Sequence, residues 1–419
     1  MRVLFVPAAM RPHFYPLVTL AWAFRAAGHD VRVAGQPAIV EQIAQSGLPA
    51  VSVGAEHDLL QNMREIFQNP AVDLAAVRQR MSRVATGGRS PKWDRAAVRE
   101  LTPEEERLRE QVTYRPHAKA AEAMAADLVP FAREWGPDLI VSDPLPYVSS
   151  LVAEVLQVPL VRHLWGPNST RRLAGHGGPT ARTAADAWPA ALVSLFEKYG
   201  ARVRDDHARL TVDPTPTRMQ IDDIPHRLPV RYVPYNGSGT VPGWLTEPVR
   251  RPRVCVTWGT TTAALTSREK YVVPTILEEL LELDVEVVAT LNREEREKLG
   301  ELDERVRLVE NLPLDWLLPT CDAIVHQAGA GTMLTAAAHG VPQVAVPQAT
   351  DQPFNAAMLR GTGAGLSVDV DGFRSGDIRK TVAAAMNDVS VREAARQLRE
   401  EVQEQPSPAE LVATLEKLV

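Results

Sequence analysis

Short apolar runs alternate with amphipathic stretches through both halves of the chain. The apolar runs are of strand length and are bounded by glycine, proline or polar residues, which is typical of strands buried in a parallel sheet. The stretches between them carry apolar residues at helical spacing, and several of them end at a glycine. We therefore expect strands at residues 3–6, 30–34, 139–141, 254–258, 285–290, 306–309, 323–325 and 342–347, and helices at 16–27, 37–46, 146–156, 333–339 and 406–419.

The regular succession of strand and helix predicts a doubly wound α/β fold. A chain of 419 residues is long enough for two such domains. Proline is dense between residues 213 and 252, which is the change of composition expected where a chain crosses between domains. The sequence thus predicts an N-terminal domain at 1–235, a linker at 236–252 and a C-terminal domain at 253–405.

The composition of the chain disfavours several classes of function. The formal net charge is −6 and no basic cluster occurs, which argues against a nucleic-acid partner. No apolar run is long enough to span a bilayer, and the chain starts directly with a strand rather than with a signal peptide. The two isolated cysteines, Cys255 and Cys321, suit buried thiols rather than a zinc site or a disulfide. We therefore expect a soluble, cytoplasmic protein.

Residues 322–356 carry the clearest functional signal. They predict a strand, a turn of small residues, a helix and a second strand. Such a turn presents backbone N–H groups at a helix N-terminus, where the helix dipole favours an anion. Gly329 and Gly331 allow close approach because they have no side chain, and His326 and Thr332 add side-chain donors. The turn is therefore expected to bind a phosphate, although a small-residue turn taken alone can also be a helix-packing loop.

The sequence HQAGAGT, followed by GVPQVAVPQATDQPFNA, resembles the donor-binding signature of family-1 glycosyltransferases with the GT-B fold. It is most similar to the bacterial branch that moves deoxysugars from dTDP-sugars onto polyketides and similar antibiotics, and the resemblance covers nearly the whole chain. It implies two Rossmann-like domains that face each other across a cleft. The N-terminal domain would bind the acceptor, the C-terminal domain would bind the nucleotide sugar, and the helix at 406–419 would cross back to the N-terminal domain.

The loop after the first strand, PAAMRPH, contains the candidate catalytic base. It lacks the G-x-G-x-x-G of dinucleotide-binding domains, which disfavours an NAD enzyme. His13 follows the carboxyl end of that strand, the edge at which open α/β sheets bind ligands. In the resembled family a histidine here, followed by a proline at the position of Pro16, removes the proton from the acceptor hydroxyl. An imidazole suits this task because its pKa lies near neutral pH.

Asp143 is the candidate partner of His13. It follows the predicted strand at 139–141, again at a carboxyl end, and the resembled family places its histidine-supporting aspartate at this point. A carboxylate on the second ring nitrogen would fix the tautomer and stabilise the imidazolium. The alternative is that Asp143 caps the helix at 146–156, which is a common role for aspartate.

The resemblance assigns further residues to the nucleotide sugar. The turn WGTTT matches a second diphosphate contact, although small polar residues also begin many helices. Carboxylate and amide groups suit vicinal sugar hydroxyls, and an Asp-Gln pair does this in the family, but the same pair also suits a helix start. The implied donor-binding residues are Gly259 and Thr260 at the diphosphate, Asn311, Leu312 and Pro313 at the nucleobase, His326, Gly329, Gly331 and Thr332 in the glycine-rich turn, and Asp351 and Gln352 at the sugar.

These features together predict an inverting glycosyltransferase with a nucleotide-sugar donor and a hydrophobic small-molecule acceptor. We expect no cofactor and no metal, because helix-terminal N–H groups can stabilise the departing diphosphate. Asp369 and Asp371 form a D-x-D, which holds a metal in another glycosyltransferase fold but here suits a solvated strand end. A carbon–carbon glycoside former, a sugar-nucleotide epimerase and a non-catalytic auxiliary protein remain alternatives. The sequence also leaves open an auxiliary activator protein and a homodimer.

Overall fold

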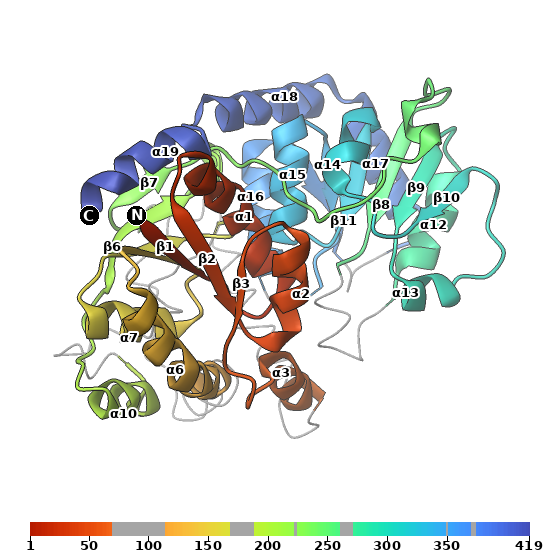
Figure 1. The fold of residues 1–419 in the computed structure, drawn as a ribbon. Coiled ribbons are helices and arrows are strands. Elements are labelled where there is room, and N and C mark those ends of the chain that lie inside the picture. Colours follow the sequence, from red (N-terminus) through yellow and green to blue (C-terminus); the bar gives the residue numbers. More distant parts are fainter. Residues whose placement is uncertain (69–113, 168–187, 222–223, 260–270, 349–350, 370–373) are drawn as a thin grey trace, which may run out of the picture.

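The computed structural model describes the chain except for residues 69–113, 168–187, 222–223, 260–270, 349–350 and 370–373. The chain forms two α/β halves, each built around a parallel sheet (Figure 1). The first sheet has seven strands in the order β3-β2-β1-β4-β5-β6-β7, and the second has six in the order β10-β9-β8-β11-β12-β13. In each half the first strand lies inside the sheet and later strands are added on both sides. This order confirms the predicted pair of doubly wound, Rossmann-like folds.

Both sheets consist of short apolar strands, and the inner strands are almost fully buried because helices cover both faces. The first sheet contains β1 (Arg2–Val6), β2 (Asp30–Gly35), β3 (Ala50–Ser52), β4 (Leu139–Ser142), β5 (Leu160–His163), β6 (Ala208–Asp213) and β7 (Arg227–Pro229). The second contains β8 (Arg253–Thr257), β9 (Glu286–Thr290), β10 (Val306–Val309), β11 (Ala323–His326), β12 (Gln343–Ala345) and β13 (Gly365–Ser367).

Helices cover the two faces of the first sheet and form two core layers. The last helix, α19 (Pro408–Leu415), belongs to one of them, where Leu411, Val412 and Leu415 pack among the buried residues of α1. Both chain ends therefore lie beside the first half (Figure 1). One face carries α6 (Arg115–Trp135), α7 (Tyr147–Leu156) and α10 (Ala190–Lys198), the other carries α1 (Arg11–Ala26), α2 (Pro37–Gln45) and α19, and α3 (Leu59–Gln68) lies against α6.

The second sheet is covered in the same way. Among the described helices, none has both the length and the apolar character that a bilayer crossing requires. One face carries α12 (Val273–Leu281) and α17 (Asp377–Asn387), and the other carries α15 (Ala330–His339), α16 (Gln352–Thr362) and α18 (Val389–Glu404). The short helices are α13 (Arg293–Glu297) and α14 (Leu314–Leu317), and single 3-10 turns lie at Thr217–Met219, Gly243–Thr246, Leu318–Thr320 and Glu416–Leu418.

Helix α1 begins at Arg11, earlier than the sequence pattern predicts, and includes Pro16 in its interior. A proline removes one backbone hydrogen bond, so the pattern favours a helix start at this residue. The helix instead starts beside Pro12, which suits a first turn because the N–H groups there have no partner within the helix. His13 therefore lies in the first turn of a helix rather than in a loop, and its N–H donates to the Met10 carbonyl at 3.0 Å.

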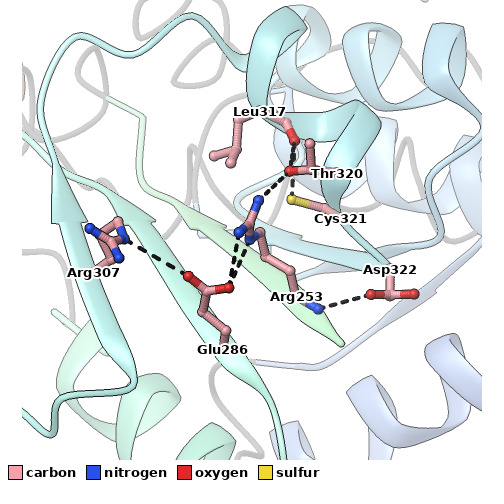
Figure 2. Close-up of polar contacts among 7 residues, drawn as sticks. All are labelled: Arg253, Glu286, Arg307, Leu317, Thr320, Cys321 and Asp322. Atoms are coloured by element: carbon pink, nitrogen blue, oxygen red, sulfur yellow. Dashed lines mark hydrogen bonds and ion pairs between the residues drawn. The ribbon is translucent and has the colours of Figure 1, made fainter. Parts of the chain in front are cut away.

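A cluster of polar contacts lies at the amino ends of the strands of the second sheet (Figure 2). Arg253 is buried, with its Nη2 3.0 Å from Glu286 Oε2, and its Nη1 donates to Thr320 Oγ1 at 2.7 Å. Arg307 lies 3.8 Å from the other oxygen of Glu286. Both guanidinium groups stand over the ring of Trp244 in the linker, at 5.3 and 4.6 Å from its centre. The carboxyl ends of the strands, at the opposite edge, remain available for ligands.

Candidate functional site

The carboxyl ends of β1 and β4 hold an imidazole–carboxylate pair. The two strands are neighbours in parallel register, so the residues that follow them lie close together. His13 Nδ1 lies 2.8 Å from Asp143 Oδ2, and the Asp143 side chain is buried. The other carboxylate oxygen accepts the Leu145 N–H at 2.8 Å. An ionised carboxylate only accepts hydrogen bonds, so Nδ1 of His13 is the donor in this contact, and Nε2 is the ring nitrogen left to accept a proton.

Asp143 does not cap helix α7 with its side chain. Helix α7 begins at Tyr147, and its N-cap residue is Pro146, which has no side-chain hydrogen bond. Asp143 precedes this turn and directs one oxygen to His13. The predicted dyad and the predicted cap are therefore distinguished by geometry, in favour of the dyad.

Trp165, which the sequence pattern does not single out, packs against the dyad. It lies just beyond β5, and the centres of its ring and of the His13 ring are 4.3 Å apart. Ala8, Met10 and Leu145 form an apolar cluster around it. The imidazole is thus held by a carboxylate at one nitrogen and by an aromatic ring beside it. A large aromatic residue directly after a strand was the available signal, but strand order is needed to place it next to His13.

A second buried imidazole lies near His13. His117 is in the first turn of α6, and burial lowers its pKa to about 4, with smaller contributions in the same direction from His13 and His57. Its ring centre is 6.4 Å from that of Tyr147. His117 is therefore neutral near pH 7 and adds no positive charge to the edge of the sheet that carries the dyad.

The glycine-rich turn lies at the N-terminus of α15. Gly329 is the N-cap residue, and no side chain of the described residues caps the helix. Neither Gly329 nor Gly331 has a positive φ, so the backbone conformation does not require glycine at either position. A methyl group at Gly329 would meet nothing within 4 Å, and one at Gly331 would reach Tyr232 Oη at 3.9 Å. Thr332 is partly exposed beside them. Side-chain atoms thus do not crowd the two glycines, and the helix N-terminus has no side-chain cap among the described residues, as an anion site requires.

His326 is buried behind this turn rather than exposed in it. Its Nδ1 accepts the Ala328 N–H at 3.0 Å, and its Nε2 lies 3.0 Å from Gln343 Oε1. Burial lowers its pKa to about 4, although the bond to Gln343 acts in the opposite direction. The neutral ring therefore uses both nitrogens within the protein and supports Ala328, whose φ is 65°. A direct bond from His326 to a phosphate stays a prediction, and it would require the ring to give up one of these partners.

The turn after β8 is tied to the glycine-rich turn. The N–H of Gly259 donates to Gln327 Oε1 at 3.0 Å. A methyl group at Gly259 would lie 2.9 Å from that oxygen, so the Gln327 side chain would have to shift to admit one. Thr260, the residue predicted beside it, lies outside the described part of the chain. The two segments predicted to bind the diphosphate are thus neighbours in space.

Asn311, Leu312 and Pro313, which are predicted to hold the nucleobase, connect β10 to α14. Asn311 has a φ of 54°, Leu312 is buried, and Pro313 is the N-cap residue of the helix. The linker passes directly against this segment, since a methyl group at Gly239 would lie 3.2 Å from Pro313 Cδ and 3.4 Å from the Asn311 carbonyl oxygen. The linker therefore covers one side of the predicted nucleobase segment.

Asp351 and Gln352, which are predicted to contact the sugar, begin helix α16. Asp351 is its N-cap residue but does not cap it with the side chain. Gln352 is buried, and its Oε1 accepts the Gln348 N–H at 2.8 Å. Asn355 Nδ2 donates to Asp351 Oδ2 at 3.0 Å and to the Ala328 carbonyl at 2.9 Å. Asn355, which was not predicted, thus links the sugar residues to the glycine-rich turn, and its spacing of one helical turn from Asp351 was the available signal.

The cysteines and acidic residues offer no assembled metal site in the described part of the chain. Across the residues outside the gaps, no group of three or more His, Cys, Asp or Glu side chains is placed to hold a metal ion. Cys255 and Cys321 are free, and burial raises the pKa of both thiols, that of Cys321 to about 12. Asp371 of the D-x-D lies outside the described residues.

The two halves meet beside both predicted sites. Helix α1 lies against α15 (Figure 1). Trp165, whose ring packs against that of His13, is followed by Gly166, where a methyl group would lie 2.6 Å from Ala330 Cβ. Ala330 is the first residue of α15. A continuous series of contacts therefore runs from the imidazole of the first half to the glycine-rich turn of the second.

Comparison with known proteins accounts for both halves. Two domain models of the family described as "Erythromycin biosynthesis protein CIII-like" match the chain, the N-terminal domain at residues 22–259 and the C-terminal domain at residues 274–418. The 10-deoxymethynolide desosaminyltransferase of Streptomyces venezuelae is 36% identical over 430 residues, which cover 100% of this chain and 97% of that protein. The tylactone mycaminosyltransferase of Streptomyces fradiae is 35% identical over 431 residues, 100% of this chain and 92% of that protein.

Solved structures resemble the whole chain as well. Spinosyn forosaminyltransferase SpnP has a TM-score of 0.77 and 33% identity, and the match covers 100% of this chain and 99% of that one. Glycosyltransferase VinC in complex with dTDP has a TM-score of 0.76 and 30% identity, with the same two coverages. The chain therefore belongs to the erythromycin biosynthesis protein CIII-like family and is a glycosyltransferase with the GT-B fold.

Proposed function

We propose that this glycosyltransferase moves a deoxysugar from a dTDP-sugar to a hydroxyl group of a polyketide or similar aglycone, with inversion at the anomeric carbon. The relatives support this choice of substrates, since they include a 10-deoxymethynolide desosaminyltransferase, a tylactone mycaminosyltransferase and a structure that contains dTDP. The observation that carries the mechanism is the 2.8 Å contact between His13 Nδ1 and Asp143 Oδ2. His13 belongs to α1, which lies against α15 of the second half.

In this mechanism His13 is the general base. Its Nε2 takes the proton of the acceptor hydroxyl as the oxygen attacks the anomeric carbon from the side opposite the diphosphate. The new carbon–oxygen bond forms while the bond to the β-phosphate oxygen breaks, so one displacement inverts the anomeric centre. Asp143 stabilises the imidazolium that results, because its carboxylate already accepts the proton on Nδ1.

The second half supplies the donor site. The N–H groups at Gly329, Gly331 and Thr332 belong to a helix N-terminus without a side-chain cap among the described residues, which favours the charge that develops on the leaving diphosphate. We assign Gly259 and Thr260 to the same diphosphate. His326 supports the glycine-rich turn, and it would contact a phosphate if its ring gave up one of its two hydrogen-bond partners. We assign Asn311, Leu312 and Pro313 to the nucleobase, and Asp351 and Gln352 to the sugar.

His13→Ala tests the assignment of the base. We expect turnover to fall by a factor of about 100 to 10,000, the range that general-base help supplies, with an unchanged dissociation constant for dTDP. Turnover is measured by liquid chromatography and mass spectrometry with dTDP-sugars and a panel of polyketide aglycones. Incubation of the wild-type protein with a dTDP-sugar alone should leave the sugar unchanged, which separates transfer from epimerisation.

The matched control is His29→Ala. His29 Nε2 lies 2.8 Å from Glu416 Oε1, so this variant also removes an imidazole–carboxylate contact, but at the far end of α1 from His13. It should turn over at the wild-type rate. Unchanged turnover in His13→Ala, or an equal loss in both variants, would falsify the role of His13.

A further inference from the structure

We propose that Gln327 is a diphosphate-binding residue that joins the two turns of the donor site. Its side-chain oxygen holds the turn after β8, and its Nε2 donates to the diphosphate that lies between that turn and the glycine-rich turn. The inference rests on the proposed function, because it assumes a nucleoside diphosphate at this edge. It adds a side-chain donor that the motif itself does not indicate.

The orientation of the Gln327 amide is fixed by its neighbour. β8 and β11 are adjacent parallel strands, with Thr257 opposite His326, so Gly259 and Gln327 both lie just beyond the paired ends. The Gly259 N–H donates to Gln327 Oε1 at 3.0 Å, and a donor can meet only the oxygen end of the amide. The nitrogen must therefore point to the other side, away from the Gly259 N–H.

That nitrogen is buried and lacks an acceptor. Gln327 is 3% exposed, and its Nε2 makes no hydrogen bond within the described structure. Buried amide groups in folded proteins are almost always paired with protein, water or ligand, so this group calls for an acceptor that binds from outside. Gln343, on the next strand, shows the ordinary case, since its oxygen pairs with His326 and its nitrogen donates to the Met333 carbonyl at 3.2 Å.

The surroundings of this amide suit a ligand group that accepts hydrogen bonds and donates none, such as a diphosphate. The indole N–H of Trp258, directly before Gly259, is also unpaired among the described residues, but its ring packs in the apolar core of the second half. Beside the Asp351 carboxylate, where the sugar is expected, the unpaired group is instead an acceptor, Asn355 Oδ1. The unpaired donor of Gln327 thus belongs to the turns assigned to the diphosphate, and the unpaired acceptor of Asn355 belongs to the segment assigned to the sugar hydroxyl groups. This distribution matches the hydrogen-bonding capacity of a nucleotide sugar.

Gln327→Glu tests the inference, because a carboxylate still accepts the Gly259 N–H but donates nothing and carries a negative charge. We expect the dissociation constant for dTDP to rise about 100-fold, because the variant loses the hydrogen bond to the charged diphosphate and adds a charge that repels it, and that for thymidine to change less than about twofold. Gln327→Met, which adds no charge to the interior, should weaken dTDP binding about 10-fold and again spare thymidine. Both constants are measured by titration calorimetry.

Gln36→Glu is the control, because Gln36 is another buried glutamine but its amide already donates to the carbonyl groups of Gly54 and His57. It should leave dTDP binding unchanged. Unchanged dTDP affinity in both Gln327 variants, or equal losses for dTDP and thymidine, would overturn the role of Gln327 alone. A wild-type protein that binds no nucleoside diphosphate would overturn the proposed function and this inference together.

Discussion

Gly166→Ala acts directly on the contact between the two halves. A Cβ atom at this position would lie 2.6 Å from Ala330 Cβ, whereas carbon atoms in contact stay about 3.5–4.0 Å apart. The contact must therefore open by about 1 Å. Within a well-packed core such crowding costs about 1–3 kcal/mol of stability. Here the crowded atoms belong to different halves, so the halves can move apart instead.

The expected loss is therefore in turnover rather than in stability. Trp165 joins Gly166 to the His13 ring, and Ala330 begins the helix whose N-terminus faces the proposed diphosphate. Separation of the halves would move the base away from the anomeric carbon, and a misplacement of about 1 Å can reduce a rate about 100-fold. We expect kcat to fall by about this factor. The dissociation constant for dTDP should not change, because the donor site belongs to the second half.

A second substitution makes the prediction specific. Ala330→Gly removes the opposing methyl group, so the double variant Gly166→Ala/Ala330→Gly should recover most of the lost turnover. Gly300→Ala is the control, because a methyl group there meets nothing within 4 Å. Initial rates are measured by liquid chromatography and mass spectrometry, and the separation of the halves by small-angle X-ray scattering. Full activity in Gly166→Ala, or a double variant as slow as the single one, would refute the idea that this contact sets the spacing.

Two further predictions concern stability. Arg253→Ala should lower the free energy of unfolding by about 3–5 kcal/mol, because it removes a buried arginine from an ion pair with Glu286 (Figure 2). Arg307→Ala should cost no more than about 1 kcal/mol, because the Arg307 side chain, which contacts the same carboxylate, is much more exposed; equal losses in urea unfolding would contradict this. His117 and His326 have folded-state pKa values of about 4, below the usual 6.5, so the unfolded state binds more protons as the pH falls. Stability should therefore be complete above pH 6.5 and decline between pH 6.5 and 4, by up to about 3 kcal/mol for each histidine, and His117→Asn should flatten that slope in urea unfolding measured against pH.

Local pattern was enough to predict β1, β2, β4, the strands from β8 to β12, and the glycine-rich turn, but not the remaining strands. Buried parallel strands are uninterrupted apolar runs, and the turn combines small residues with a helix start, so both are visible in a few consecutive residues. The predicted start of α1 was wrong because we expected the helix to begin at Pro16, where a proline removes a backbone hydrogen bond. The apolar face of α1 packs in the core and keeps the helix intact around this proline.

The contacts within the site depend on strand order, which consecutive residues do not contain. His13 and Asp143 are 130 positions apart and meet because β1 and β4 are neighbours. Trp165 reaches His13 because β5 lies next to β4, and Gln327 reaches Gly259 because β11 lies next to β8. The type of His326 suggested a donor to phosphate, but its ring partners come from a neighbouring strand and its own turn, and only the fold shows them.

The position of Gly166 shows why one residue can matter to catalysis without touching a substrate. Its φ is not positive, so the backbone would accept other residues, and the reason for glycine is the approach of Ala330. The His13–Asp143 dyad is complete within the first half, and the glycine-rich turn is complete within the second. In the proposed mechanism donor binding therefore needs only the second half, whereas the chemical step needs both halves at a fixed spacing. We expect the absent side chain at Gly166 to set that spacing, which no periodic pattern in the sequence reveals.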